Sequence, residues 1–181
     1  MIRLIAYYGI VAGLIVAVPM VWMMMTLTPQ TAPANGAIYG YLTMIVALTA
    51  VFMGIKHYRD KVLGGVIKFG PALLVGLGIS AVASVIYCVG WEISLAWSGF
   101  DFAQSYSQSI VEAARAKGAS PAEVQKVIAD GESFVKMYAN PLYRVPITFI
   151  EMFPVGVVIS LISAALLRNS RLLPARSQVQ G

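Results

Sequence analysis

The sequence predicts an all-α integral membrane protein with four transmembrane helices and an extracytoplasmic helical hairpin between spans three and four. Three observations favour this class. Hydrophobic residues make up 59% of the 181 positions and charged residues only 12%, where soluble domains carry roughly 25% charged residues. The charges gather at the ends of long apolar runs, and one polar segment between the last two runs has helix signals of its own. We therefore expect the lipid bilayer to be the solvent for most of the chain.

The first two spans come from one long uncharged interval. No Asp, Glu, Lys, Arg or His lies between Arg3 and Lys56, and this interval is long enough for two crossings of about 20 residues each. A segment rich in Pro and Gly, residues 28–36, divides it and predicts a turn. The predicted spans are residues 4–27 and 37–55. We expect the first to be an uncleaved helix, because its apolar core exceeds the roughly 7–15 residues of a signal peptide.

Two further apolar runs predict the third and fourth spans. Residues 70–92 begin just before Pro71 and end at Trp91-Glu92, whereas residues 145–167 contain one charge, Glu151. Each run reaches across a bilayer at the helical rise of about 1.5 Å per residue. The whole chain, residues 1–181, is thus expected to form a single membrane domain.

The distribution of Lys and Arg predicts the orientation. The side of the membrane with the excess of Lys and Arg in its short flanks is cytoplasmic. One side has a single acid, Asp60, and eight basic residues: Arg3, Lys56, Arg59, Lys61, Lys68, Arg168, Arg171 and Arg176. We therefore expect both termini, including a tail at residues 168–181, to be cytoplasmic. This placement explains the net charge of +5 without nucleic acid as a partner.

The polar segment at residues 98–144 predicts a helical hairpin outside the membrane. Ser120, Pro121 and Glu123 form a helix start, with a Ser cap, Pro at the first helical position and Glu three residues after the cap. Apolar residues recur at helical spacing before and after Gly118. Two amphipathic helices of this size are expected to cover each other and the outer mouth of the bundle.

Small residues at intervals of four predict how the spans pack. Helices in a bilayer associate through close backbone contact, because lipid tails offer no hydrophobic driving force between them. The candidate packing positions are Gly9, Gly13, Gly76, Ser80, Ser84, Gly156 and Ser160. The third span has the longest series and is the expected central helix. Its neighbour can belong to the same chain or to another copy.

The loop after the second span resembles a known family. The stretch from Gly54 to Lys61, GIKHYRDK, and the glycine-rich stretch from Leu63 to Gly70, LGGVIKFG, are similar to the signature of the membrane proteins catalogued as domain of unknown function 4199. The resemblance extends to Trp91-Glu92 and the hairpin. It implies a small bacterial inner-membrane protein of four spans, and it brings no established activity or catalytic residues.

This loop carries the first candidate site. Its basic residues and its histidine are Lys56, His57, Arg59, Lys61 and Lys68. Each Lys or Arg gains about 1 kcal/mol beside an anionic membrane surface, so ordinary anchoring explains the cluster. The alternative is a specific contact with a lipid headgroup or a partner, for which Gly64-Gly65 would let backbone amides approach a phosphate.

The two acids near the membrane, Glu92 and Glu151, are the second candidate site. An ionisable group inside a span is costly and often functional. Both residues are expected at similar depth, where they could face each other and hold a proton or a cation. The alternatives are that both are wetted near the headgroups or that one pairs with Arg144.

No motif in the sequence indicates an enzyme. The single cysteine and the single histidine, Cys88 and His57, exclude a cysteine-based metal cluster and match no catalytic constellation, so we expect no cofactor. The favoured hypothesis is a non-enzymatic accessory or scaffold component that contacts a membrane protein or a second copy of itself. The alternative is a small oligomeric transporter or channel that uses Glu92 and Glu151.

Overall fold

The computed structural model describes residues 1–26, 36–99 and 101–175, and all regular elements in these ranges are helical. The elements are α1 (Ile2–Thr26), α2 (Gly36–His57), the short π-helical η1 (Tyr58–Val62), α3 (Phe69–Trp97), α4 (Phe102–Ala116), α5 (Pro121–Tyr138) and α6 (Pro141–Leu167). The turn predicted at residues 28–36 lies outside the described residues, apart from Gly36 at the start of α2.

In the described part of the chain, four helices are long and apolar enough to cross a membrane: α1, α2 with its continuation through η1, α3 and α6. The prediction of an all-helical chain with four such helices is confirmed. The helix α6 begins at Pro141 rather than near Val145, because Asn140 caps it by accepting a hydrogen bond from the Leu142 amide at 3.0 Å. Proline is tolerated at the first helical position, where an amide hydrogen would have no partner.

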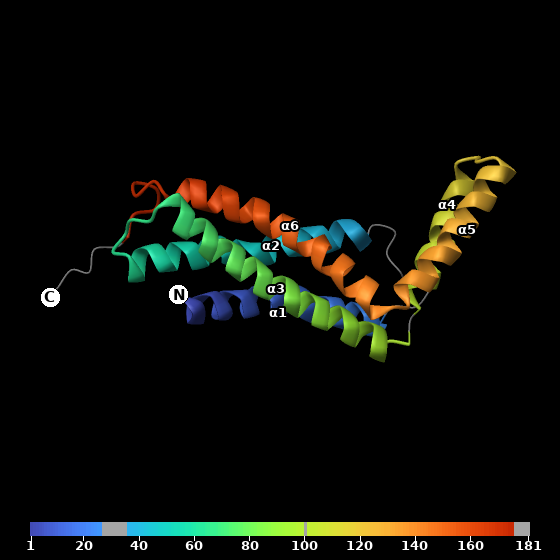
Figure 1. The fold of residues 1–181 in the computed structure, drawn as a ribbon, viewed down its shortest axis with the longest axis horizontal. Coiled ribbons are helices and arrows are strands. Elements are labelled where there is room, and N and C mark those ends of the chain that lie inside the picture. The colour runs from blue at the N-terminus through green and yellow to red at the C-terminus, as the bar shows by residue number, and fades with distance from the viewer. Residues whose placement is uncertain (27–35, 100, 176–181) are drawn as a thin grey trace.

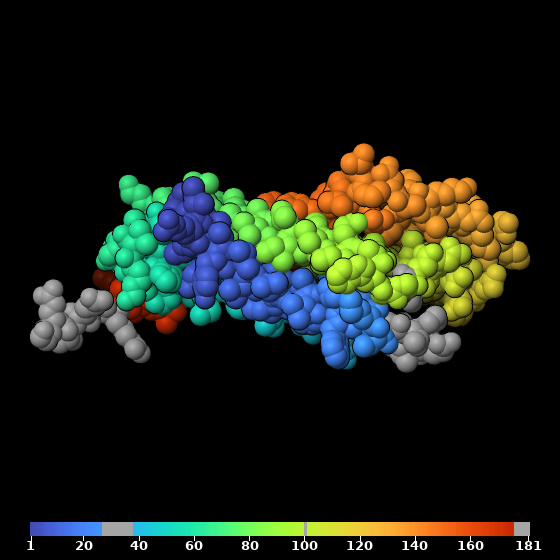
Figure 2. Space-filling model, turned by 90° about the horizontal axis from the view of Figure 1, so that it is seen from below, coloured from blue at the N-terminus to red at the C-terminus, as the bar shows by residue number. Residues whose placement is uncertain are grey.

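The four long helices form a bundle in which α3 is central (Figure 1). Its most extensive contacts are with α1 and α6, and α2 closes the bundle against α1 and α6. Figure 2 shows α1 lying along α3 over much of the bundle. The expectation that the third span is central is confirmed, because α3 contacts α1 on one face and α6 on another.

One face of α3 packs on α6 through pairs of small residues. A Cβ added to Gly76 would lie 2.8 Å from the Ser160 Cβ, and one added to Gly156 would lie 2.6 Å from the Ser80 Cβ. The hydroxyl oxygens of Ser80 and Ser160 are 3.3 Å apart. These reciprocal contacts leave no room for a larger side chain on either helix.

The other face of α3 packs on α1, where glycines of both helices allow close approach. A Cβ at Gly9 would lie 2.5 Å from the Val82 Cβ, and one at Gly13 would lie 2.6 Å from the Ile86 Cβ. Further along the same interface, Gly90 of α3 faces Ala17 of α1. All seven candidate packing residues, including Ser84, are buried within this chain.

Buried serine hydroxyls in the bundle bond to their own helices. Ser80 donates to the Gly76 carbonyl at 2.9 Å, Ser84 donates to the Ser80 carbonyl at 2.9 Å, and Ser160 donates to the Gly156 carbonyl at 2.7 Å. Burying an unpaired hydroxyl is costly. The backward bond satisfies the hydroxyl and keeps the side chain small enough for close helix contact.

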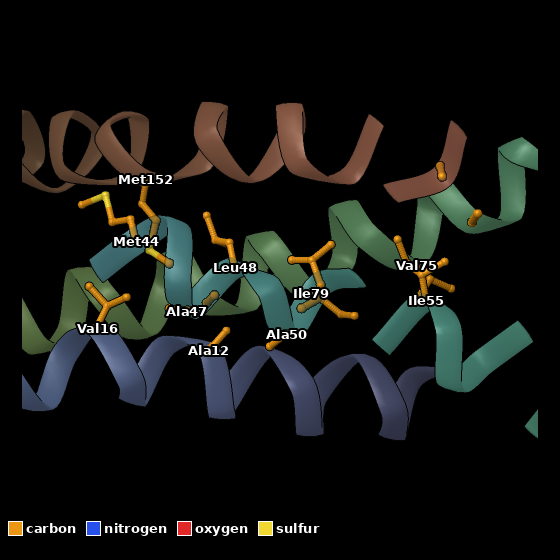
Figure 3. Packing of buried hydrophobic residues seen from close by; sticks show 14 of the residues in the cluster. Ala12, Val16, Met44, Ala47, Leu48, Ala50, Ile55, Val75, Ile79 and Met152 are labelled. Atoms are coloured by element: carbon orange, nitrogen blue, oxygen red, sulfur yellow. The ribbon is translucent and has the colours of Figure 1, made fainter. Parts of the chain in front are cut away.

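Larger apolar side chains fill the space between the four helices (Figure 3). Val16 from α1, Met44 and Leu48 from α2, Ile79 from α3 and Met152 from α6 are buried in one cluster. Figure 3 shows Met44 beside Met152 where α2 passes α6. The core is therefore built from all four membrane-type helices.

The helices α4 and α5 lie side by side as an antiparallel pair and project from the end of the bundle (Figure 1). The predicted capping box is present, since the Ser120 hydroxyl accepts from the Glu123 amide and the Glu123 carboxylate accepts from the Ser120 amide at 2.8 Å. These bonds lower the pKa of Glu123. A Cβ at Gly131 would lie 2.2 Å from the Ser107 hydroxyl, so the two helices touch closely there.

The contact between α3 and α6 predicts the effect of substituting its glycines. We expect Gly76→Ala to reduce the free energy of unfolding by about 1–3 kcal/mol, because the added methyl group overlaps Ser160 and overpacking costs this much. The measurement is unfolding of the purified full chain in detergent. The matched control is Gly40→Ala in α2, where a Cβ meets nothing within 4 Å. Equal stability of the two variants would contradict the close contact.

Candidate functional site

The two ends of the bundle hold the candidate sites. We call the end where α3 finishes and α6 begins the hairpin end, and the end with residues 58–68 the loop end. At the hairpin end, Glu92 of α3 and Arg144 of α6 form a two-point ion pair, with Nε to Oε1 at 2.7 Å and Nη2 to Oε2 at 2.5 Å. Arg144 Nη1 also donates to the Tyr138 carbonyl at 2.9 Å. One guanidinium thus joins α3, α6 and the end of α5.

Aromatic rings surround this ion pair and complete what we call the joint, made of Trp91, Glu92, Phe102, Tyr138 and Arg144. The Trp91 indole donates to the Tyr138 hydroxyl at 2.7 Å. Phe102 of α4 meets the Trp91 ring edge to face at 4.9 Å and the Tyr138 ring at 5.8 Å. Burial raises the pKa of Tyr138 to about 12, so its hydroxyl stays protonated at neutral pH.

The joint ties both helices of the hairpin to α3 and α6. Phe102 is the first residue of α4 and Tyr138 the last of α5, so the contacts hold the hairpin at its base. Edge-to-face ring pairs contribute about 0.5–1.5 kcal/mol each. Arginine with two hydrogen bonds to one carboxylate fixes direction as well as distance. The hairpin is therefore held in one orientation relative to the bundle.

Glu151 has surroundings different from those of Glu92. Its side chain is exposed on α6, and it accepts one hydrogen bond from the Tyr87 hydroxyl of α3 at 3.4 Å. Within the described residues, no hydrogen bond joins Glu92 to Glu151. The partner of Glu92 is Arg144, which was one of the sequence alternatives, whereas Glu151 accepts its hydrogen bond from Tyr87.

At the loop end, Arg59 is fully buried and holds the chain that follows α6. Its Nε donates to Asp60 at 2.6 Å. Its Nη1 donates to the Leu172 carbonyl at 2.9 Å, and its Nη2 donates to the Leu173 carbonyl at 2.5 Å. Arg59 was predicted as a headgroup or partner contact, and its burial corrects that prediction because a side chain without exposed surface reaches neither.

The other residues predicted to contact a headgroup or a partner differ in exposure and in their bonds within the protein. Lys56 pairs with Asp60, one turn further along. His57 is exposed, and its Nδ1 lies 3.0 Å from the Tyr8 hydroxyl of α1. Lys61 and Lys68 are exposed to the surroundings.

The glycine turn of the loop is already engaged by the protein. Gly64 and Gly65 have φ values of 69° and 98°, which favour glycine. The Gly65 amide donates to the Arg59 carbonyl at 2.8 Å. That amide is therefore not free for a phosphate, contrary to the role expected for it.

Several site residues were not singled out from the sequence. Tyr87, Phe102 and Tyr138 look like ordinary apolar positions on amphipathic or spanning helices, and their polar contacts depend on which helices meet. The carbonyls of Leu172 and Leu173 leave no sequence signal at all. In the part of the chain that the structure describes, no three His, Cys, Asp or Glu side chains gather as a metal site.

Fold and site together define the class: a small helical protein with four membrane-type helices and a fastened helical hairpin. The chain belongs to the family described as proteins of unknown function DUF4199, whose profile matches residues 7–169. The match spans the bundle, the loop and the hairpin, so the resemblance of GIKHYRDK and the following glycines is confirmed. No curated protein and no solved structure matches the chain.

The contacts of Arg59 predict how the segment after α6 behaves. We expect Arg59→Lys to speed tryptic cleavage after Arg168 and Arg171 several-fold. The planar guanidinium of Arg59 donates to the Leu172 and Leu173 carbonyls at once, and the single ammonium group of lysine does not reproduce this geometry. Limited proteolysis of the full chain followed by mass spectrometry measures the rates. The matched control is Lys61→Arg, which exchanges the same two residue types in the opposite direction at an exposed position of the loop. Unchanged cleavage in both variants would show that Arg59 does not hold this segment.

Proposed function

We propose that this protein is a non-enzymatic accessory or scaffold component of a bacterial cytoplasmic membrane. In this proposal the bundle crosses the membrane and presents the α4–α5 hairpin on the extracytoplasmic side to a partner protein. The observation that supports it most directly is the joint, because the ion pair of Glu92 with Arg144 and the rings of Trp91, Phe102 and Tyr138 fasten the hairpin. A fastened arm suits recognition, since little orientational freedom is lost on binding.

The charge distribution supports the proposed orientation. The loop end has Lys61, Lys68, Arg168 and Arg171 exposed, and an excess of Lys and Arg in short flanks marks the cytoplasmic side. The hairpin end has acids and bases in balance along residues 98–144. With four crossings, both ends of the chain then lie on the cytoplasmic side.

The hairpin also offers surface for a partner. Tyr106 and Ile110 of α4 and Met137 of α5 are large apolar side chains that stay exposed although the two helices cover each other. Aromatic residues and methionine are enriched at protein interfaces relative to other surfaces. The proposed partner is another membrane protein or a second copy of this chain, and in either case both proteins are embedded in the lipid bilayer.

Photo-crosslinking in cells tests the scaffold proposal. A photoreactive amino acid at Ile110 is expected to capture one defined protein, whereas the same probe at the exposed Lys126 of α5 is the matched control. Glu92→Gln should lower the capture at Ile110 several-fold with the bundle still folded, because the neutral amide weakens the pair with Arg144. Capture without a defined product, or capture unaffected by Glu92→Gln, would contradict a fastened recognition arm.

A second candidate function rests on Glu151. An exposed carboxylate on a membrane-type helix is costly unless a proton, a cation or another chain accompanies it. This favours a small oligomeric transporter or channel, with Glu151 in place of the acid pair and Glu92 in a structural role. The family and the four helices are equally compatible with either function.

Proteoliposome flux separates the two functions. If the chain conducts protons or cations, Glu151→Gln should abolish the flux because the amide no longer exchanges a proton or binds a cation. Asp130→Gln, on the exposed face of α5, is the control and should leave the flux unchanged. Equal flux with and without Glu151→Gln would exclude the role of this carboxylate.

A further inference from the structure

One acidic side chain lies on the outer face of α6, inside the stretch that is apolar enough to span a membrane. Glu151 is the only acid in this helix, and it is exposed. At a rise of 1.5 Å per residue, Glu151 is about 10 Å along the helix from Arg144 and about 25 Å from Arg168. The hydrocarbon core of a bilayer is about 30 Å thick. With the two arginines at its two surfaces, the Glu151 carboxyl group lies within the hydrocarbon.

The chain itself compensates this carboxyl group only in part. The Tyr87 hydroxyl donates to Oε2 of Glu151 at 3.4 Å, which is long for a hydrogen bond. Among the described residues, Oε1 has no hydrogen-bond partner, and no Lys, Arg or His side chain pairs with Glu151. The next residue, Met152, is buried in the core between the helices (Figure 3). The unmatched side of Glu151 therefore has to find its partner outside this chain.

The chemistry of a carboxyl group in hydrocarbon limits what that partner can be. An isolated carboxylate is far more costly there than the neutral acid, so the group takes up a proton. A protonated carboxyl has one O–H donor and keeps acceptor capacity on its other oxygen. Because Tyr87 donates to Oε2, Oε1 is the oxygen that carries the proton. Lipid tails offer no acceptor for this O–H group.

The exposed face of α6 around Glu151 suits contact with an identical helix. Residues exposed on this face follow one another at intervals of three and four, and we call them the outer stripe: Glu151, Pro154, Val158, Leu161 and Ala165. This spacing is that of the contact seam in left-handed helix pairs, which are common in membranes. Copies of one chain enter a membrane in the same orientation. A two-fold axis between them then places each residue of the stripe at the same depth as its own copy.

We infer that two copies of this chain associate through the outer stripe of α6, with their Glu151 carboxyl groups hydrogen-bonded to each other. Each Oε1–H donates to Oε2 of Glu151 in the second copy, so both acids are neutral and both donors are satisfied. A carboxylic acid is its own complement, and symmetry supplies it at the right depth. A different protein would need a polar group of its own at that level.

The inference rests on the proposed crossing of the membrane by the bundle. It depends neither on the partner of the hairpin nor on transport. Capture at Ile110 tests the hairpin, which lies outside the bundle, whereas the pairing is measured within α6. The two proposals can therefore fail separately.

The dissociation constant of the pair tests the role of Glu151 on the full chain in lipid vesicles. Energy transfer between copies labelled at the N-terminus with a donor or an acceptor fluorophore gives the dimer fraction at each ratio of protein to lipid. Glu151→Leu should raise the dissociation constant about tenfold, which corresponds to about 1.4 kcal/mol. This is the size of effect that polar groups have between membrane helices.

Glu151→Gln is the matched control for the loss of the carboxyl group. The amide also has a donor and an acceptor, so the dissociation constant should stay within about threefold of the native value. The same variant separates pairing from transport, because it ends proton exchange by this side chain and keeps the pairing. Helical content of each variant, measured by circular dichroism, checks that the bundle is intact.

Disulfide crosslinking tests which face of the bundle is in contact. In a chain with Cys88→Ser, which removes the native cysteine, Val158→Cys should give a covalent dimer under a mild oxidant. Val85→Cys on α3 is the control, because Val85 and Val158 are each 54% exposed and only Val158 belongs to the outer stripe. Its yield of dimer should be at least fivefold lower.

Three results would overturn the inference. A chain that stays monomeric at every ratio of protein to lipid would show that Glu151 is satisfied without a second copy. A dissociation constant unchanged by Glu151→Leu would remove the carboxyl pair. Equal crosslinking at positions 85 and 158 would show that the copies do not meet through the outer stripe.

Discussion

Close approach of α3 to its two neighbours is the constraint on which the rest of the structure depends. Lipid tails solvate leucine as well as another helix does, so helices in a bilayer need dense contact to associate. Gly76 and Gly156 face serines of the opposite helix, and Gly9 and Gly13 let α1 reach Val82 and Ile86. With α1 and α6 fixed on separate faces of α3, the two ends of the bundle have defined shapes.

At each end of the bundle, one arginine side chain holds a neighbouring segment of the chain in place through hydrogen bonds. Arg144 binds Glu92 and the Tyr138 carbonyl, which connects the hairpin to α3 and α6. Arg59 binds the carbonyls of Leu172 and Leu173, which connects the loop after α2 to the chain after α6. Both side chains satisfy backbone groups that would otherwise lose hydrogen bonds near the membrane, where unpaired polar groups are costly. The joint therefore gives the hairpin end a fixed arm, on which the proposed function depends.

The sequence predicted the helices well because the signals for them are local. An interval without charge between Arg3 and Lys56 needs only its length to indicate two crossings. The capping box at Ser120 and Glu123 is complete within four residues, and it is present in the structure. Small residues at intervals of four lie on one helix face whatever the neighbour is, so Gly76, Ser80 and Ser160 could be named as packing positions without knowledge of their partners.

Side-chain partners, in contrast, were decided by the tertiary structure. Glu92 and Arg144 are separated by 52 positions, and Arg59 and Leu172 by 113. Whether such groups meet depends on the rotation and crossing of helices to within about an ångström, the tolerance of a hydrogen bond. The sequence by itself thus determined how many apolar helices there are, which residues they span and which helix faces carry small side chains. Only the packing of those helices decided that Glu92 pairs with Arg144, that Glu151 bonds with Tyr87, and that the Arg59 side chain is buried rather than exposed.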